Sequence, residues 1–162
     1  MSNLIHICHL TSVHPRFDIR IFHKQCVTLS TKGYRVTLVV ADGKGDEVCN
    51  GVNIRDVGCS AGGRLGRMIK TVSRIYRFAR AENADVYHFH DAELLMVGLL
   101  LERKKPVIYD VHEDLPRQIL TKYYLPKIFR SLIAKCFELI ENISVRKLSA
   151  ISTATPTLEI DL

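Results

Sequence analysis

The chain has 162 residues, 47% of them hydrophobic and 25% charged, a composition that predicts one globular domain rather than a disordered segment. Lys and Arg outnumber Asp and Glu by 23 to 17, so the expected partners are anionic. Five cysteines form no Cys-x-x-Cys pair, and their odd number argues against a disulfide framework. With no signal peptide and no apolar run long enough to span a bilayer, we expect a cytoplasmic protein.

The predicted strands and helices alternate along the chain. Alternating or β-branched apolar runs predict strands at 4–8, 34–41, 52–57, 85–89, 106–111 and 150–153. Helical spacing predicts helices at 19–33, 65–80, 91–102 and roughly 125–147, the third buried because it is apolar nearly all round. Residues 42–51 are interpreted as a loop, which is short for a crossover. The order predicts a Rossmann-like α/β domain, a parallel sheet with helices on both faces.

Ligands of such a sheet gather outside the carboxyl ends of its strands, and this rule selects four loops. They carry polar or glycine-rich sequence: the first has His14, Arg16, Asp18 and Arg20, the second is 58–67, the third begins with His90 and Asp91, and the fourth is His112-Glu113-Asp114. Hydroxyl-binding is the favoured interpretation of His90, Asp91, His112 and Glu113. Helix capping is the alternative for Asp91 and the favoured role of Asp114.

The sequence signals for other types of binding site are weaker. The first loop lacks Gly-x-Gly-x-x-Gly, and the chain has no Walker A motif. The stretch from Gly62 to Gly66 fits a phosphate cradle, although a plain glycine loop is favoured. His88 and His90 project to the same face of a strand, but no third residue stands at metal-site spacing, so no metal is expected. Without a zinc-finger, RNP or helix-turn-helix pattern, nucleic acid is not an expected partner either.

The helix predicted at 65–80 has an apolar arc, and its remaining surface is basic without any acidic residue. This face predicts electrostatic contact with an anionic membrane surface, with an ordinary solvated helix as the alternative. The basic residues proposed for it are Arg67, Lys70, Arg74 and Arg77, and a second basic stretch, Lys122, Lys127, Arg130 and Lys135, would extend it.

The chain resembles the N-terminal half of a GT-B fold glycosyltransferase of the retaining family four. The segments that carry the resemblance are 14–20, 32–36, 85–91, 105–113 and 150–156, in order over essentially the whole chain. One departure is the first loop, where many members have a Gly-Gly pair and this chain has Ser12-Val13-His14-Pro15.

The resemblance implies that residues 1–162 are a single acceptor-binding domain and that the donor-binding domain lies outside this chain. His112 matches the family's cleft histidine and is the expected catalytic residue. His14, Arg20, His90, Asp91 and Glu113 would contact acceptor or substrate hydroxyls. The implied donor is a nucleotide-diphosphate sugar, used without a metal, and the implied acceptor is lipid-linked or a glycan of a cell-surface polysaccharide or glycolipid. The fragment alone would be inactive, on the inner face of the membrane.

Two competing functions remain open. A non-catalytic basic α/β module that docks on anionic membrane or on a protein partner would explain the basic helix alone. A sugar-nucleotide epimerase half would share the fold, but it should carry more carboxylates for proton abstraction than these loops contain.

Overall fold

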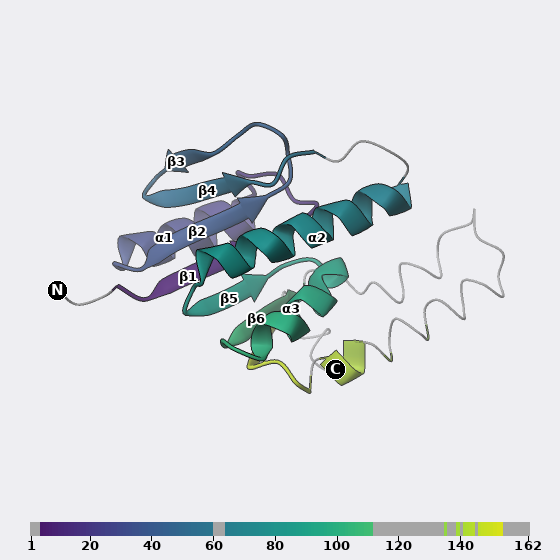
Figure 1. The fold of residues 1–162 in the computed structure, drawn as a ribbon. Coiled ribbons are helices and arrows are strands. Elements are labelled where there is room, and N and C mark those ends of the chain that lie inside the picture. Colours follow the sequence, from purple (N-terminus) through teal and green to yellow (C-terminus); the bar gives the residue numbers. More distant parts are fainter. Residues whose placement is uncertain are drawn as a thin grey trace.

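The computed structural model describes residues 4–59, 64–111, 135, 139, 141–144 and 146–153. Its strands form one sheet in the order β3-β4-β2-β1-β5-β6-β7 (Figure 1). The bounds are β1 His6–Leu10, β2 Arg35–Val40, β3 Glu47–Cys49, β4 Val52–Asp56, β5 Val86–Phe89, β6 Val107–Val111 and β7 Ala150–Thr153. All neighbours pair in parallel except β3, which is antiparallel to β4.

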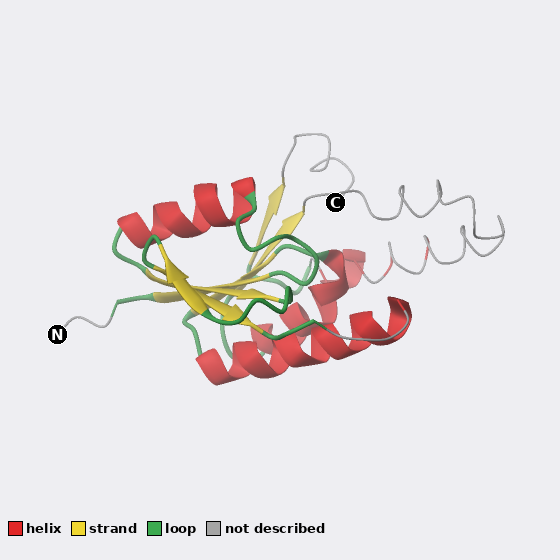
Figure 2. Cartoon of the chain, turned by 90° about the horizontal axis from the view of Figure 1, so that it is seen from above, coloured by secondary structure: helices red, strands yellow, loops and turns green. Residues whose placement is uncertain are grey.

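The helices lie on both faces of the sheet. Figure 2 shows the π-helix η1 and the short α1 on one face and α2 and α3 on the other. Their bounds are η1 Ile19–Cys26, α1 Val27–Thr31, α2 Arg64–Glu82, η2 Ala92–Leu94 and α3 Leu95–Glu102. The Rossmann-like prediction is thus confirmed. The chain builds outward from β1 to β2 and β4 and then starts the other half at β5, so the topological switch point lies between β1 and β5.

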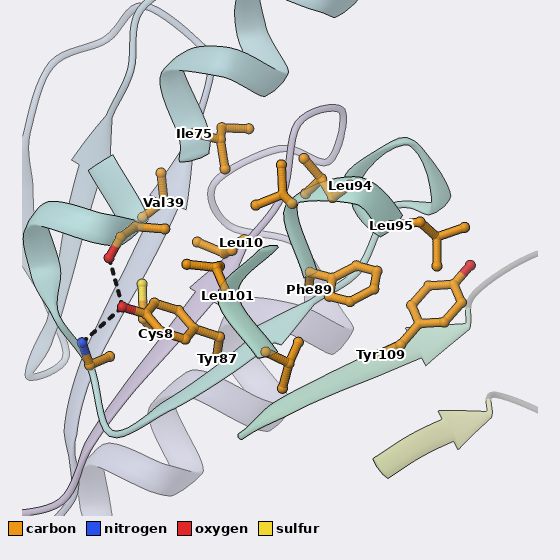
Figure 3. Packing of buried hydrophobic residues seen from close by; sticks show 14 of the residues in the cluster. Cys8, Leu10, Val39, Ile75, Tyr87, Phe89, Leu94, Leu95, Leu101 and Tyr109 are labelled. Carbon is orange, nitrogen blue, oxygen red and sulfur yellow. Dashed lines mark hydrogen bonds between the residues drawn. The ribbon is translucent and has the colours of Figure 1, made fainter. Parts of the chain in front are cut away.

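Each face of the sheet has its own hydrophobic cluster. Under α2 and α3, Phe89 of β5 stacks on Tyr109 of β6 with ring centroids 4.6 Å apart (Figure 3). In the same cluster the Tyr87 hydroxyl donates to the Ala79 carbonyl at 2.8 Å and accepts from the Ala84 amide at 3.1 Å. Under η1 the second cluster joins three residues of that helix to valine, leucine and isoleucine of β2 and β4. Burying both clusters fixes the two layers on the sheet.

Two strand predictions differ from the structure. The first strand runs from His6 to Leu10 rather than over residues 4–8; Leu4 and Ile5 are largely exposed, and burial begins at His6. The segment predicted as a loop contains β3, which turns into β4 through Asn50-Gly51, both with positive φ. An Asn-Gly pair between apolar residues is typical of a hairpin turn. Because β3 runs back along the sheet before the turn into β4, β4 pairs in parallel with β2 without a crossover helix.

Two helix predictions also need correction. The helix after β5 is not buried all round, since Met96 and Leu100 are 57% and 38% exposed. Ile69 falls in the predicted apolar arc of α2, yet its side chain is exposed. Most of the helix predicted at 125–147 lies outside the described residues; within it, residues 141–144 are helical. The final predicted strand is confirmed as β7.

Candidate functional site

Polar side chains gather at the switch point, on the face of the sheet that η1 covers. Because side chains alternate along a strand, Cys8, Tyr87 and Tyr109 point to the α2 side, and their neighbours in sequence point to η1. On that second face β2 and β4 present aliphatic residues to η1. The three strands β1, β5 and β6 instead present, at or just beyond their carboxyl ends, His9, His88, His90 and Asp110.

Asp110 is the centre of this polar group and is fully buried. One carboxylate oxygen pairs with the Arg20 guanidinium. The other accepts hydrogen bonds from Gln25 Nε2 at 2.8 Å and from His90 Nδ1 at 3.2 Å. The sequence predicted Arg20 and His90 as site residues but not Asp110 and Gln25, because an aspartate within a strand and a glutamine within a helix carry no motif. The signal available was a charged residue inside the otherwise apolar run of the β6 strand.

The cluster of His9, His88 and His90 could hold a metal ion by proximity, since one nitrogen from each lies within 4.8 Å of the others. The third histidine, His9, comes from β1, so local spacing around His88 could not reveal it. Its Nδ1 is already 3.0 Å from His90 Nε2, and Asp110 holds the other nitrogen of His90. Burial lowers the pKa of His9 well below its usual value, and His88 and His90 lower it further, which favours the neutral form of the ring. His9, His90 and Asp110 therefore form a hydrogen-bonded network, which we call the histidine network.

Asp91 fastens the first loop to the end of β5. Its carboxylate accepts hydrogen bonds from the Ser12 amide at 2.6 Å and the Thr11 hydroxyl at 2.8 Å, and it lies 2.8 Å from His14 Nδ1. Burial alone would raise the pKa of Asp91, but the hydrogen bonds from His14 and Ser12 outweigh it and the pKa lies below its usual value. The side chain makes no cap hydrogen bond to η2. Asp91 therefore orients His14, whose side chain is 25% exposed.

Arg16 of the same loop is almost fully buried away from the histidines. Its guanidinium donates to Asp42 Oδ2 at 2.7 Å and to the Gly45 carbonyl at 3.1 Å, and it pairs with Glu47. The Arg16 hydrogen bond lowers the pKa of Asp42, as expected for a strong ion pair. Arg16 ties the first loop to the segment between β2 and β3, which makes it a structural residue.

The basic residues of α2 do not form a single free face. Lys70 and Arg77 are exposed, and the guanidinium of Arg80 lies 5.7 Å from the Tyr76 ring centroid. Arg74 is half-buried, and its Nη1 lies 3.4–3.5 Å from the carbonyls of residues 57–59. Arg74 thus holds the loop before α2. The side chain of Arg67 lies outside the described residues.

Several predicted site residues fall outside the described part of the chain: His112, Glu113, Asp114, and Gly62 with Gly63. Of the second basic stretch only Lys135 is described, and it is exposed. Among the helices that the structure describes, none combines the length and the apolar composition that crossing a membrane requires.

Comparisons with known proteins bear on the family and the fold. The family model described as Glycosyltransferase Family 4 matches residues 20–160. Among solved structures, the chain is similar to sucrose-phosphate synthase from Thermosynechococcus elongatus, with a TM-score of 0.69 and 11% sequence identity. The match covers 96% of this chain and 44% of that protein, so the chain spans less than half of its length. The search of curated proteins gave no match.

Proposed function

The chain belongs to glycosyltransferase family 4, and from that premise we propose that it is the acceptor-binding half of a retaining, nucleotide-sugar-dependent glycosyltransferase. The observation that supports this role is the gathering of Arg20, His14, His90 and Asp91 at the switch point between β1 and β5. Ligands of Rossmann-like sheets bind at this point. The proposed acceptor is lipid-linked or a glycan, in cell-surface polysaccharide or glycolipid synthesis.

In the proposed reaction the acceptor oxygen bonds to the anomeric carbon of the donor sugar as the bond to the diphosphate breaks. The bonding electrons leave with the diphosphate, which takes up the acceptor's hydroxyl proton, and a donor-binding domain beyond this chain would stabilise that charge without a metal. His112 and Glu113 follow β6 directly in sequence, and His112 is proposed to contact the sugar being transferred. His14, oriented by Asp91, is proposed to bind an acceptor hydroxyl through its partly exposed imidazole.

Calorimetric titration tests this proposal. We expect the chain to bind a lipid-diphosphate acceptor mimic and not UDP- or GDP-sugars, since the proposed donor site lies in another domain. His14→Ala and His112→Ala should each weaken binding of the mimic by about tenfold, the loss expected for one hydrogen bond to a charged or polar ligand. His23→Ala is the matched control, because His23 is exposed on η1 and lies outside the network. Tight binding of a nucleotide sugar without the acceptor mimic would contradict the proposal.

A second candidate function is docking on an anionic membrane surface. It is favoured by the exposed Lys70 and Arg77 of α2, which lie on the same helix as the exposed apolar residues Ile69 and Phe78. Each basic residue near an anionic surface contributes about 1 kcal/mol, and the apolar side chains would add contact with the headgroup layer. The two functions are compatible, because α2 lies on the face of the sheet opposite η1 (Figure 2).

Vesicle flotation separates docking from acceptor binding. The double variant Lys70→Glu with Arg77→Glu should lose flotation with phosphatidylglycerol vesicles while keeping its affinity for the soluble acceptor mimic. The control, Lys24→Glu with Lys32→Glu, changes the net charge equally at exposed positions on the η1–α1 layer. Equal loss of flotation in both double variants would mean that net charge alone drives the contact and that α2 is no docking surface.

A further inference from the structure

The buried carboxylate of Asp110 takes no direct part in the proposed reaction. Removing its charge from water is costly unless an opposite charge and hydrogen bonds compensate. Arg20 supplies the opposite charge on one oxygen, and Gln25 and His90 supply hydrogen bonds to the other. Two of these three partners come from η1, so the helix and the sheet are joined at this point by polar contacts beside the aliphatic cluster.

The π-helical geometry of η1 is what lets both helix side chains reach Asp110. Arg20 and Gln25 are five residues apart, which in an α-helix would place them roughly 140° apart around the axis. In η1 the His23 amide bonds to the Asp18 carbonyl at 3.2 Å, and the Val27 amide bonds to the Phe22 carbonyl, both spanning five residues. This wider turn returns residue 25 to the side of residue 20. π-Helical segments are rare and occur frequently at functional sites.

The network also assigns protons to the histidines. A carboxylate can only accept, so the hydrogen in the 3.2 Å contact sits on His90 Nδ1. A neutral His90 then accepts at Nε2 from His9 Nδ1, 3.0 Å away. The two rings lie nearly parallel, with an interplanar angle of 9° and ring centroids 5.3 Å apart. With both rings neutral, this arrangement places the proton of each imidazole on Nδ1.

We infer that η1 is a positioning element: it holds Arg20 and Gln25 on Asp110, and Asp110 fixes the orientation and the Nδ1–H form of His90 at the end of β5. Asp110 also precedes the proposed catalytic His112 by two residues, so the same network anchors the strand end that leads to it. The consequence for acceptor binding rests on the proposed function. In this scheme Arg20 acts through Asp110, whereas the family resemblance implies direct contact of Arg20 with the acceptor.

Long-range ¹H–¹⁵N spectra of histidine-labelled protein test the network. We expect the wild-type signals of His90 and His9 to show a protonated Nδ1 and an unprotonated Nε2. Arg20→Met should turn His90 into a mixture of tautomers, because the buried Asp110 without its charged partner takes up a proton and can then donate to His90 Nδ1. Arg20→Lys should restore most of the wild-type signal. Arg16→Met is the matched control, an equivalent loss of a paired arginine in the loop before η1, where its partners are Asp42 and Glu47 rather than the histidine network. A wild-type His90 protonated on Nε2, or one unchanged by Arg20→Met, would overturn the inference.

Titration of the same variants with the lipid-diphosphate mimic distinguishes positioning from direct contact. If Arg20 acts through Asp110, Arg20→Met weakens binding by about tenfold together with the change at His90, and Arg20→Lys recovers both. Weaker binding with an unaltered His90 signal would make Arg20 a direct ligand and overturn the positioning role. Failure of the wild-type chain to bind the mimic would count against the proposed function alone, since the His90 spectra decide the network independently.

Discussion

Asp91 and Glu93 are carboxylates two residues apart whose surroundings act on them in opposite directions. Asp91 receives hydrogen bonds from the first loop, and its pKa is lowered although burial opposes this. Burial raises the pKa of Glu93, the nearby Asp91 charge raises it further, and a hydrogen bond from Ser12 only partly offsets both. The charge on Asp91 is therefore stabilised by the fold, and the charge on Glu93 is not.

We predict that Asp91→Asn lowers the free energy of unfolding at pH 7 by about 2 kcal/mol, because Ser12, Thr11 and His14 lose a charged acceptor. Glu93→Gln should leave it unchanged within about 0.5 kcal/mol or raise it, since the variant removes a poorly solvated charge. Urea denaturation of the two variants measures both values. A larger loss for Glu93→Gln than for Asp91→Asn would contradict this account of the loop.

A single sequence predicts some residues of the site and not others. His90, Asp91 and Arg20 were predicted because polar residues beside predicted strand ends stand out. His9 and Asp110 were missed, since each lies inside a strand and its partner is tens of residues away: His9 meets His90, and Asp110 meets Gln25. Contacts across such separations depend on strand order, which local patterns do not contain.

At the scale of elements, α3 packs on the sheet through a glycine. A Cβ built on Gly98 would lie 2.5 Å from Phe89 Cε1, and Phe89 cannot retreat because it stacks on Tyr109. Gly98→Ala should therefore destabilise the protein by about 2 kcal/mol, even though alanine favours the helix by about 1 kcal/mol.

Met96→Ala on the exposed side of the same helix is the control and should change stability by less than about 0.5 kcal/mol. Both variants can be compared by urea denaturation at one pH. A Gly98→Ala protein as stable as the wild type would show that α3 can shift away from β5 at little cost, and that the close approach is no constraint on the fold.

Regular elements were predicted well and irregular ones were not, for a physical reason. The β2 strand is a continuous apolar, β-branched run, and α2 is a long amphipathic helix, so local sequence predicts both elements even though Ile69 is exposed. The π-helical form of η1 arises where Arg20 and Gln25 both bind Asp110, a tertiary contact that the helical pattern of residues 19–33 does not encode. The three-residue β3 is too short for a periodic signal; the Asn50-Gly51 turn is typical of a hairpin, but residues 42–51 were predicted as a loop.

For the whole molecule, buried histidines link stability to pH. Burial lowers the pKa of His9 well below its usual value, and burial together with the Arg35 charge lowers that of His6, against the opposing effect of Glu82 and Asp85. Above about pH 6.5, both states leave these rings neutral and stability is independent of them. As pH falls below that value the unfolded chain binds protons that the folded chain resists, so stability decreases until the lowered pKa is reached.

We predict that His9 alone lowers the free energy of unfolding by roughly 1 kcal/mol between pH 7.5 and pH 5.5. His9→Gln should be less stable than the wild type at pH 7.5 but should lose correspondingly less on acidification, as urea denaturation at the two pH values would measure. Val97→Ala serves as the control, because it removes buried apolar contacts without a titrating group and should lower stability equally at both pH values.

Over this pH range Asp42 and Asp91, whose pKa values are lowered, stay ionised in the folded and unfolded states and add little to the pH dependence of stability. Equal slopes for the wild type and His9→Gln would mean that His9 becomes protonated inside the fold, and the neutral relay from His9 through His90 to Asp110 would then be wrong.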